Sequence, residues 1–279
     1  MLAPARMAAV AGCMLARSMN TLTLTLLALP IYLSCGWLAW SRRTPLVPLT
    51  ALALLLHAVA LGLGLVHEGS LRSGVTEAAS LFAWQSALLL WLFSFREPVQ
   101  INGVALYPLA GLFALWAALQ PSPVSQVRIE DWQVSVHVML SLLSASLLTL
   151  AAVQSATLAV QDRLLHRHRM AASSRRMPPL QTMERMLFQL IGLGFALLSL
   201  TLLSGLWFVH DWLTQNLAHK TVLSITAWVI FGVLLWGRWR YGWRGRTAIR
   251  WALTGYAMLI LAYFGSKLIL EQIFGKHWV

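Results

Sequence analysis

The chain has 279 residues, of which 58% are hydrophobic and only 11% are charged, whereas about 25% of the residues in an ordinary soluble domain are charged. This composition excludes a soluble enzyme, a disordered tail and a secreted disulfide scaffold. The formal net charge is +12, but the basic residues lie in short clusters between long apolar runs. That pattern favours a membrane protein over a nucleic-acid-binding one.

Eight apolar segments follow one another, each close to the 20 residues that a helix needs to cross about 30 Å of hydrocarbon. We expect helices at residues 21–40, 47–66, 78–95, 102–119, 133–160, 186–209, 219–236 and 250–270. The runs show no polar alternation, which excludes a membrane barrel. The sequence therefore predicts an all-α fold, a polytopic membrane helix bundle with about eight transmembrane helices.

Residues 133–160 are more than a helix needs to cross the bilayer, so we expect this helix to extend into water at its cytoplasmic end. The segment is rich in serine and alanine. These small residues let membrane helices approach one another closely.

Basic residues predict the orientation of the bundle. Fourteen arginines follow the first, third, fifth and seventh segments, whereas the loops between them carry only Arg72, Arg128 and Lys220. The positive-inside rule then places both chain ends outside (N-out, C-out). It places four loops in the cytoplasm, at residues 41–46, 96–101, 161–185 and 237–249.

Residues 1–18 do not fit this topology, because Arg6 and Arg17 would lie outside. The stretch also lacks the apolar core and the cleavage site of a signal peptide. We predict that residues 1–18 are a dispensable or misannotated N-terminal lead, with translation starting near Met19. Residues 19–279 would then form a single transmembrane domain.

Histidines within membrane spans are functional candidates by default. His137 is expected about one turn below the outer surface, and neutral imidazole is a common haem and metal ligand. The alternative is a packed histidine that is hydrogen-bonded to Ser141, one turn along the same helix. His57 lies near the centre of its segment and is a second candidate metal ligand, or else hydrogen-bonds a neighbouring helix.

The loop between the sixth and seventh segments combines aromatic, histidine and lysine side chains. Its candidate residues, at or near the outer surface, are Trp207, His210, Trp212, His219 and Lys220. Aromatic rings stack on a tetrapyrrole, imidazole binds iron, and an ammonium group pairs with a propionate. The alternative is an ordinary aromatic belt at a helix end.

Several of these stretches together resemble a known family. They are the run from Val136 to Ser144, Ser204-Gly205-Leu206-Trp207 through Trp212, His219-Lys220-Thr221 and Trp228, Trp236-Gly237, the run from Gly242 to Arg246, and the run from Leu261 to Gly265. They resemble the cytochrome c assembly superfamily of haem-handling membrane proteins (the CcsA/CcmC type), most closely its HemX/YpjD-like branch. The resemblance covers about residues 50–270. Of the family's haem histidines His137 carries over, whereas Trp236 and Phe274 stand where synthase-type members have histidines.

The resemblance implies a protein of the bacterial inner membrane that binds or handles haem at its outer face during cytochrome complex assembly. His137 would be the axial ligand, His219 or His210 the second ligand, Trp207 and Trp212 the stacking surface, and Lys220 the propionate partner. Haem b would bind non-covalently, because Cys13 and Cys35 form no CxxCH pattern.

No residue pattern predicts catalysis, so we expect no enzymatic activity. The expected partners are the lipid bilayer, haem, and cytochrome-maturation or haem-biosynthesis proteins, with no nucleic acid. Two alternatives remain at this point. One is a regulatory or scaffold membrane protein that binds no haem and affects tetrapyrrole synthesis. The other is a metal-ion transporter using His57 and His137, which is weakened because no predicted span carries Asp or Glu.

Overall fold

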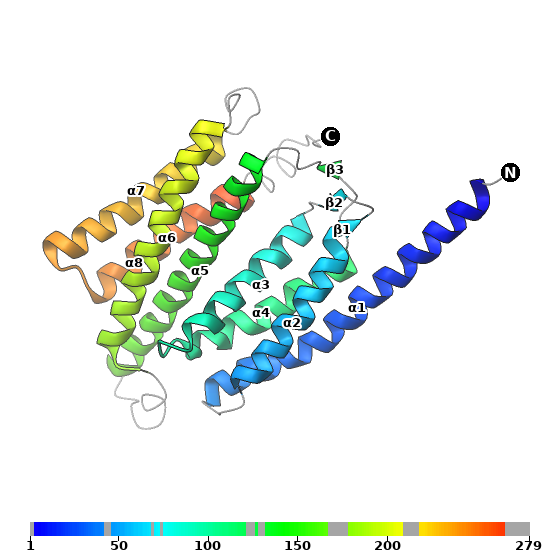
Figure 1. The fold of residues 1–279 in the computed structure, drawn as a ribbon. Coiled ribbons are helices and arrows are strands. Elements are labelled where there is room, and N and C mark those ends of the chain that lie inside the picture. The colour runs from blue at the N-terminus through cyan, green and yellow to red at the C-terminus, as the bar shows by residue number, and fades with distance from the viewer. Residues whose placement is uncertain are drawn as a thin grey trace. The chain divides into compact units, whose positions relative to one another are not determined.

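The computed structural model describes residues 3–41, 46–67, 70–72, 75–120, 126–127, 132–166, 178–208 and 218–265. Figure 1 shows that helices dominate the fold. Within the described ranges the α-helices are α1 (Ala3–Ser41), α2 (Leu46–Leu65), α3 (Val75–Phe93), α4 (Gly103–Leu119), α5 (Trp132–His166), α6 (Leu180–Phe208), α7 (Ala218–Tyr241) and α8 (Gly245–Ile260). Each of the eight apolar segments therefore contains a helix, which confirms the predicted all-α bundle.

Six of these helices are long and apolar enough to cross a membrane. The candidate spans among the described residues are Met19–Ser41, Val47–Gly64, Gln100–Leu119, Ser135–Leu164, Leu180–Trp207 and Lys220–Tyr241. The third span begins in a 3₁₀ turn, η1 (Gln100–Asn102), ahead of α4. α8 has 16 residues and continues into a π-helical turn, η3 (Leu261–Gly265). The chain is a multi-pass membrane protein, and the orientation predicted from its loops stays a prediction.

The sequence did not predict a small antiparallel sheet that accompanies α2, α3 and α4. It consists of β1 (Val66–His67), β2 (Ser70–Arg72) and β3 (Gln126–Val127) in the order β1-β2-β3. Val66 pairs with Leu71, which in turn pairs with Val127. Strands of two or three residues are too short to leave a period-two pattern in a sequence.

Residues 3–18, expected to be a lead, are helical and continue α1, which has 39 residues. At 1.5 Å per residue such a helix is about 58 Å long, roughly twice the thickness of the hydrocarbon. This part of the sequence is rich in alanine and methionine, which are strong helix formers. Figure 1 shows it as the blue stretch of α1 that runs on beyond α2, α3 and α4. That residues 1–18 are dispensable stays a prediction.

The chain divides into two compact units, Met1–Glu130 and Asp131–Val279. In the first unit α1 packs against α2 and α4, and α3 packs against α2 and α4. In the second unit α5 packs against α6 and α8, and α7 packs against α6 and α8. That residues 19–279 behave as a single domain stays a prediction.

Glycines allow close helix contacts in each unit. A Cβ atom built on Gly36 of α1 would come within 2.9 Å of Pro108 Cγ in α4. In the second unit, a Cβ on Gly194 of α6 would come within 2.8 Å of Leu148 in α5. At this point the Ser144 hydroxyl of α5 donates to the Gly194 carbonyl at 2.9 Å. The small residues of α5 thus bring it against the backbone of α6, as expected for membrane helices.

Candidate functional site

His137 is the sixth residue of α5, about 7.5 Å along the helix from its first residue. Its side chain is half-buried. The imidazole Nδ1 lies 2.9 Å from the Ser204 hydroxyl of α6, and this hydroxyl donates to the Thr201 carbonyl, also at 2.9 Å. The packing of α5 on α6 therefore places a serine of α6 where it can hydrogen-bond the imidazole of α5.

Ser141 is not the partner of the imidazole, which corrects the alternative drawn from the sequence. Its hydroxyl donates to the backbone carbonyls of His137 at 2.8 Å and Val138 at 2.9 Å. Serine in a helix commonly makes this local bond to the preceding turn. The side chain that satisfies His137 is Ser204, 67 positions away in the sequence.

Gly205 completes the surroundings of the ring. A Cβ atom at this position would lie 3.1 Å from Cε1 of His137 and 3.7 Å from Nδ1. The glycine backbone can therefore lie along the edge of the imidazole. Among the residues that the structure describes, Nδ1 has a hydrogen-bonding side chain and Nε2 has none, so Nε2 is the nitrogen left for an external ligand.

The remaining candidate residues lie in the sequence at the end of α6, at the start of α7 and between the two helices. Trp207, at the end of α6, is 80% exposed, and Lys220, in the first turn of α7, is exposed. His210 and Trp212 lie outside the described residues, and so does the side chain of His219, whose backbone belongs to α7. The structure thus shows a hydrogen bond between His137 and α6. The second ligand, His219 or His210, stays a prediction.

Trp228, which flanks the same loop in the sequence, belongs to the packing between α6 and α7. Its indole N–H donates to the Ser199 hydroxyl at 2.8 Å. Its ring stacks on Phe195 with centroids 5.4 Å apart. Both partners lie on α6, so these contacts explain the tryptophan without a cofactor.

The donor set at His137 fits haem better than a metal ion held by protein ligands alone. Within the described part of the chain, no three His, Cys, Asp or Glu residues are grouped so that they could hold a metal ion. Haem iron takes four nitrogens from its macrocycle and needs only one or two axial ligands from the protein. A single imidazole fixed by a hydrogen bond on its other nitrogen is a suitable axial ligand.

His57 is fully buried in α2. Its Nδ1 lies 3.2 Å from the Tyr32 hydroxyl of α1, and its Nε2 lies 2.9 Å from the Ser80 hydroxyl of α3. Both ring nitrogens are therefore hydrogen-bonded across helices. This arrangement favours the interpretation of His57 as a structural residue, and its role as a metal ligand stays an unsupported prediction.

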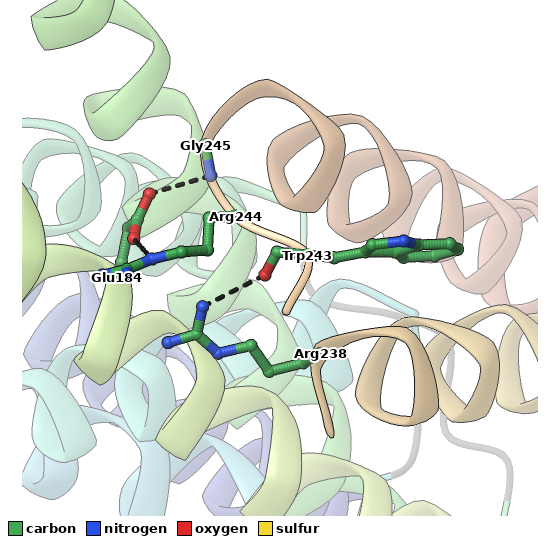
Figure 2. Close-up of polar contacts among 5 residues, drawn as sticks. All are labelled: Glu184, Arg238, Trp243, Arg244 and Gly245. Carbon is green, nitrogen blue, oxygen red and sulfur yellow. Dashed lines mark hydrogen bonds and ion pairs between the residues drawn. The ribbon is translucent and has the colours of Figure 1, made fainter. Parts of the chain in front are cut away.

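At the opposite end of the second unit, which is predicted to be cytoplasmic, Glu184 of α6 binds the turn between α7 and α8. One carboxylate oxygen accepts the Gly245 N–H at 2.8 Å, and the other accepts from Arg244 at 3.1 Å. Arg238 donates to the Trp243 carbonyl at 3.1 Å. Figure 2 shows these three contacts converging on the turn.

Two glycines make this turn feasible. Gly242 and Gly245 have φ values of +66° and +55°, which residues with a Cβ rarely adopt. The N–H of Gly242 donates to the Arg238 carbonyl at 3.2 Å, which closes α7 with an αL cap. The Gly-Trp-Arg-Gly run used for the family resemblance is therefore a helix-to-helix turn.

Sequence reasoning missed Ser204 and Glu184 as interacting residues. Ser204 directly precedes Gly205 and stands one turn before Trp207, so it shares a helix face with a residue that was singled out. Glu184 is an acidic residue near the end of the arginine-rich stretch 161–185, which was expected to be a loop. These local signals mark both positions as unusual, but neither signal identifies the partner.

Residues 45–274 match the family described as cytochrome C assembly protein. The chain belongs to this family. It is 32% identical over 244 residues to the inner membrane protein YpjD of Escherichia coli strain K12, covering 85% of this chain and 89% of that protein. This similarity places the family member in the YpjD-like branch.

Two other relatives match shorter stretches. An uncharacterized 28.8 kDa protein of Azospirillum brasilense is 34% identical over 167 residues, which are 59% of this chain and 62% of that protein. The cytochrome c biogenesis protein CcsA of Nostoc punctiforme is 27% identical over 108 residues, or 38% and 31% of the two chains. No solved structure matches the chain.

Proposed function

We propose that this family member is a non-enzymatic protein of the bacterial inner membrane that binds haem at its outer face during cytochrome complex assembly. The observation that carries the proposal is the His137 imidazole, which is half-buried near the start of α5 and tied to Ser204 through Nδ1. The names of the relatives support it at a coarser level, since one is called an inner membrane protein and another a cytochrome c biogenesis protein.

In this proposal His137 is the axial ligand, and His219 or His210 is the second one. Trp207 and Trp212 offer aromatic faces to the macrocycle. Lys220, which is exposed, pairs with a propionate. When bound, haem b supplies a redox-active iron, and the absence of a CxxCH pattern makes non-covalent binding the expected mode. Cytochrome-maturation or haem-biosynthesis proteins are the partners that would deliver or receive the haem.

The test is the absorption spectrum of protein purified in detergent from cells supplied with ample haem. We expect a Soret band that His137→Ala abolishes or shifts while expression is retained, and that added imidazole partly restores. His166→Ala is the matched control, because this histidine ends the same helix and is expected to leave the band unchanged. A Soret band unaffected by His137→Ala, together with reduced thermal stability, would contradict the site.

The second candidate function is that of a scaffold or regulator that binds no haem and affects tetrapyrrole synthesis. The turn held by Glu184 favours it, because these contacts order an arginine-rich turn at the predicted cytoplasmic end, and a basic surface suits an acidic protein partner. Under this function no Soret band forms. Substitution of the exposed Arg185 and Arg240 then changes cellular tetrapyrrole content, whereas His137→Ala does not.

Metal-ion transport through His57 and His137 has little support. The imidazole of His57 is hydrogen-bonded through both nitrogens.

A further inference from the structure

We propose that Ser204 is a positioning residue, which holds His137 in the tautomer with its proton on Nδ1 and so keeps the lone pair of Nε2 for a ligand. The tautomer follows from the contacts of the described residues alone. The identity of the ligand as haem iron rests on the proposed function.

The first step is a count of protons on the Ser204 hydroxyl. A serine hydroxyl carries one proton and can therefore donate one hydrogen bond, while its oxygen can accept. Ser204 donates to the Thr201 carbonyl at 2.9 Å. Toward Nδ1 of His137, also at 2.9 Å, the serine oxygen can then only accept. Because the hydroxyl proton is used in the bond to Thr201, we assign the proton in the contact with Nδ1 to the imidazole.

The second step concerns the Thr201 carbonyl. A carbonyl oxygen has no proton and is always the acceptor, so in its contact with Ser204 the proton belongs to the serine hydroxyl. That proton is therefore directed toward the backbone of α6 and away from the imidazole.

The third step is the consequence for the other nitrogen. A neutral imidazole has a single N–H, so a proton on Nδ1 leaves Nε2 as a lone-pair donor. Metal-bound histidines usually donate their other N–H to an oxygen, which fixes the orientation of the ring and raises its basicity as a ligand. Gly205 leaves room for the ring in this position, since a Cβ there would lie only 3.1 Å from Cε1.

The test of the tautomer needs no haem. Protein labelled with ¹⁵N-histidine is studied by NMR in detergent, and the signals of His137 are assigned by their loss in His137→Gln. We expect the shift pattern of the Nδ1–H tautomer in the unsubstituted protein. A predominant Nε2–H tautomer would overturn the proposal.

Variants separate positioning from simple packing. Ser204→Ala is expected to give a mixture of tautomers and to weaken haem binding about tenfold or more, the usual loss when the hydrogen-bond partner of a ligand is removed. Ser204→Thr, which keeps the hydroxyl, is expected to restore both readouts. Ser141→Ala is the matched control, because that hydroxyl donates to the backbone carbonyls of His137 and Val138 and not to the imidazole. Lowered thermal stability in Ser204→Ala with an unchanged tautomer would overturn the positioning role.

The two proposals fail differently. An Nδ1–H tautomer in a protein that takes up no haem refutes the proposed function and leaves the tautomer assignment standing. A Soret band that depends on His137, in a protein whose NMR shows the Nε2–H tautomer, supports the function and refutes the role of Ser204.

Discussion

His57 occupies the middle of α2 and joins three helices through one side chain. Its two nitrogens meet the hydroxyls of Tyr32 in α1 and Ser80 in α3, at 3.2 and 2.9 Å. All three residues are at most 1% exposed. Polar groups at this depth have no water to replace a lost partner, so the three side chains depend on one another.

We expect His57→Ala to reduce the free energy of unfolding by about 1–3 kcal/mol, because it leaves two buried hydroxyls without their imidazole partner. The measurement is thermal unfolding of the purified protein in detergent. Ser86→Ala is the control, since its buried hydroxyl donates within the same helix, to the Phe82 carbonyl one turn back. Equal melting temperatures for His57→Ala and the unsubstituted protein would refute this role.

At the scale of elements, the contact between α5 and α6 depends on Gly194. Gly192, on the same helix, has nothing within 4 Å of a Cβ built on it, whereas a Cβ on Gly194 would meet Leu148 at 2.8 Å. The two positions have the same residue type and differ in what lies opposite. This contact also places Ser204 of α6 against His137 of α5.

We therefore expect Gly194→Val to destabilise the protein by about 1–3 kcal/mol through overpacking, and Gly192→Val to have a much smaller effect. Both substitutions change the intrinsic helix propensity equally, so the difference between them measures the helix contact. Thermal unfolding in detergent gives the stability, and the NMR signal of His137 shows whether Ser204 has moved. Similar losses in both variants would contradict the contact.

The turn between α7 and α8 is predicted to depend on Glu184 as a cap more than as a charge. Its partner Arg244 is 54% exposed in its side chain, and ion pairs exposed in this way contribute only about 0–1 kcal/mol. The Gly245 N–H at the start of α8 is one of the donors that a helix leaves unsatisfied. We therefore expect the hydrogen bond from the Gly245 N–H to Glu184 to contribute more to stability than the ion pair with Arg244.

Glu184→Gln keeps an oxygen for Gly245 and is expected to change stability by less than about 1 kcal/mol. Glu184→Ala removes the acceptor and is expected to cost about 1 kcal/mol more, the usual value of a helix cap. Thermal unfolding of the two variants measures the difference. Equal losses would show that the ion pair with Arg244, and not the cap, stabilises the turn.

At the scale of the whole molecule, the orientation in the membrane is open to direct test. Some of the arginines counted for the predicted orientation also form ion pairs within the fold. Arg244 pairs with Glu184, and Arg246 pairs with Asp162. Both pairs nevertheless lie at the end of the second unit that the loops predict to be cytoplasmic. The internal contacts are thus compatible with the positive-inside prediction.

We expect alkaline phosphatase fused after residue 279 to be active, since this enzyme folds only outside the cytoplasm and the C-terminus is predicted to be there. The same reporter inserted within residues 161–185 is expected to be inactive. Expression of both fusions is followed by immunoblotting. An inactive C-terminal fusion at normal levels would reverse the predicted orientation.

The sequence alone determined the number and approximate position of the helices. A stretch of about 20 apolar residues must satisfy its backbone hydrogen bonds within itself in a bilayer, so the helix is dictated locally. Helix ends were less predictable: α6 begins at Leu180 and α8 at Gly245, several residues outside the apolar segments. The first N–H groups of a helix need partners from outside its own hydrogen-bond ladder, and at α8 this partner is Glu184 of α6.

The sequence also singled out His137, because an ionisable residue in a membrane span is costly unless something satisfies it. Only the tertiary structure decided that the partner is Ser204 and not Ser141, and that His57 is satisfied by Tyr32 and Ser80. These partners lie 23 to 67 positions apart. Which of them meet depends on the rotation of each helix about its axis. Packing between helices sets that rotation, and the hydropathy of a single segment does not encode it.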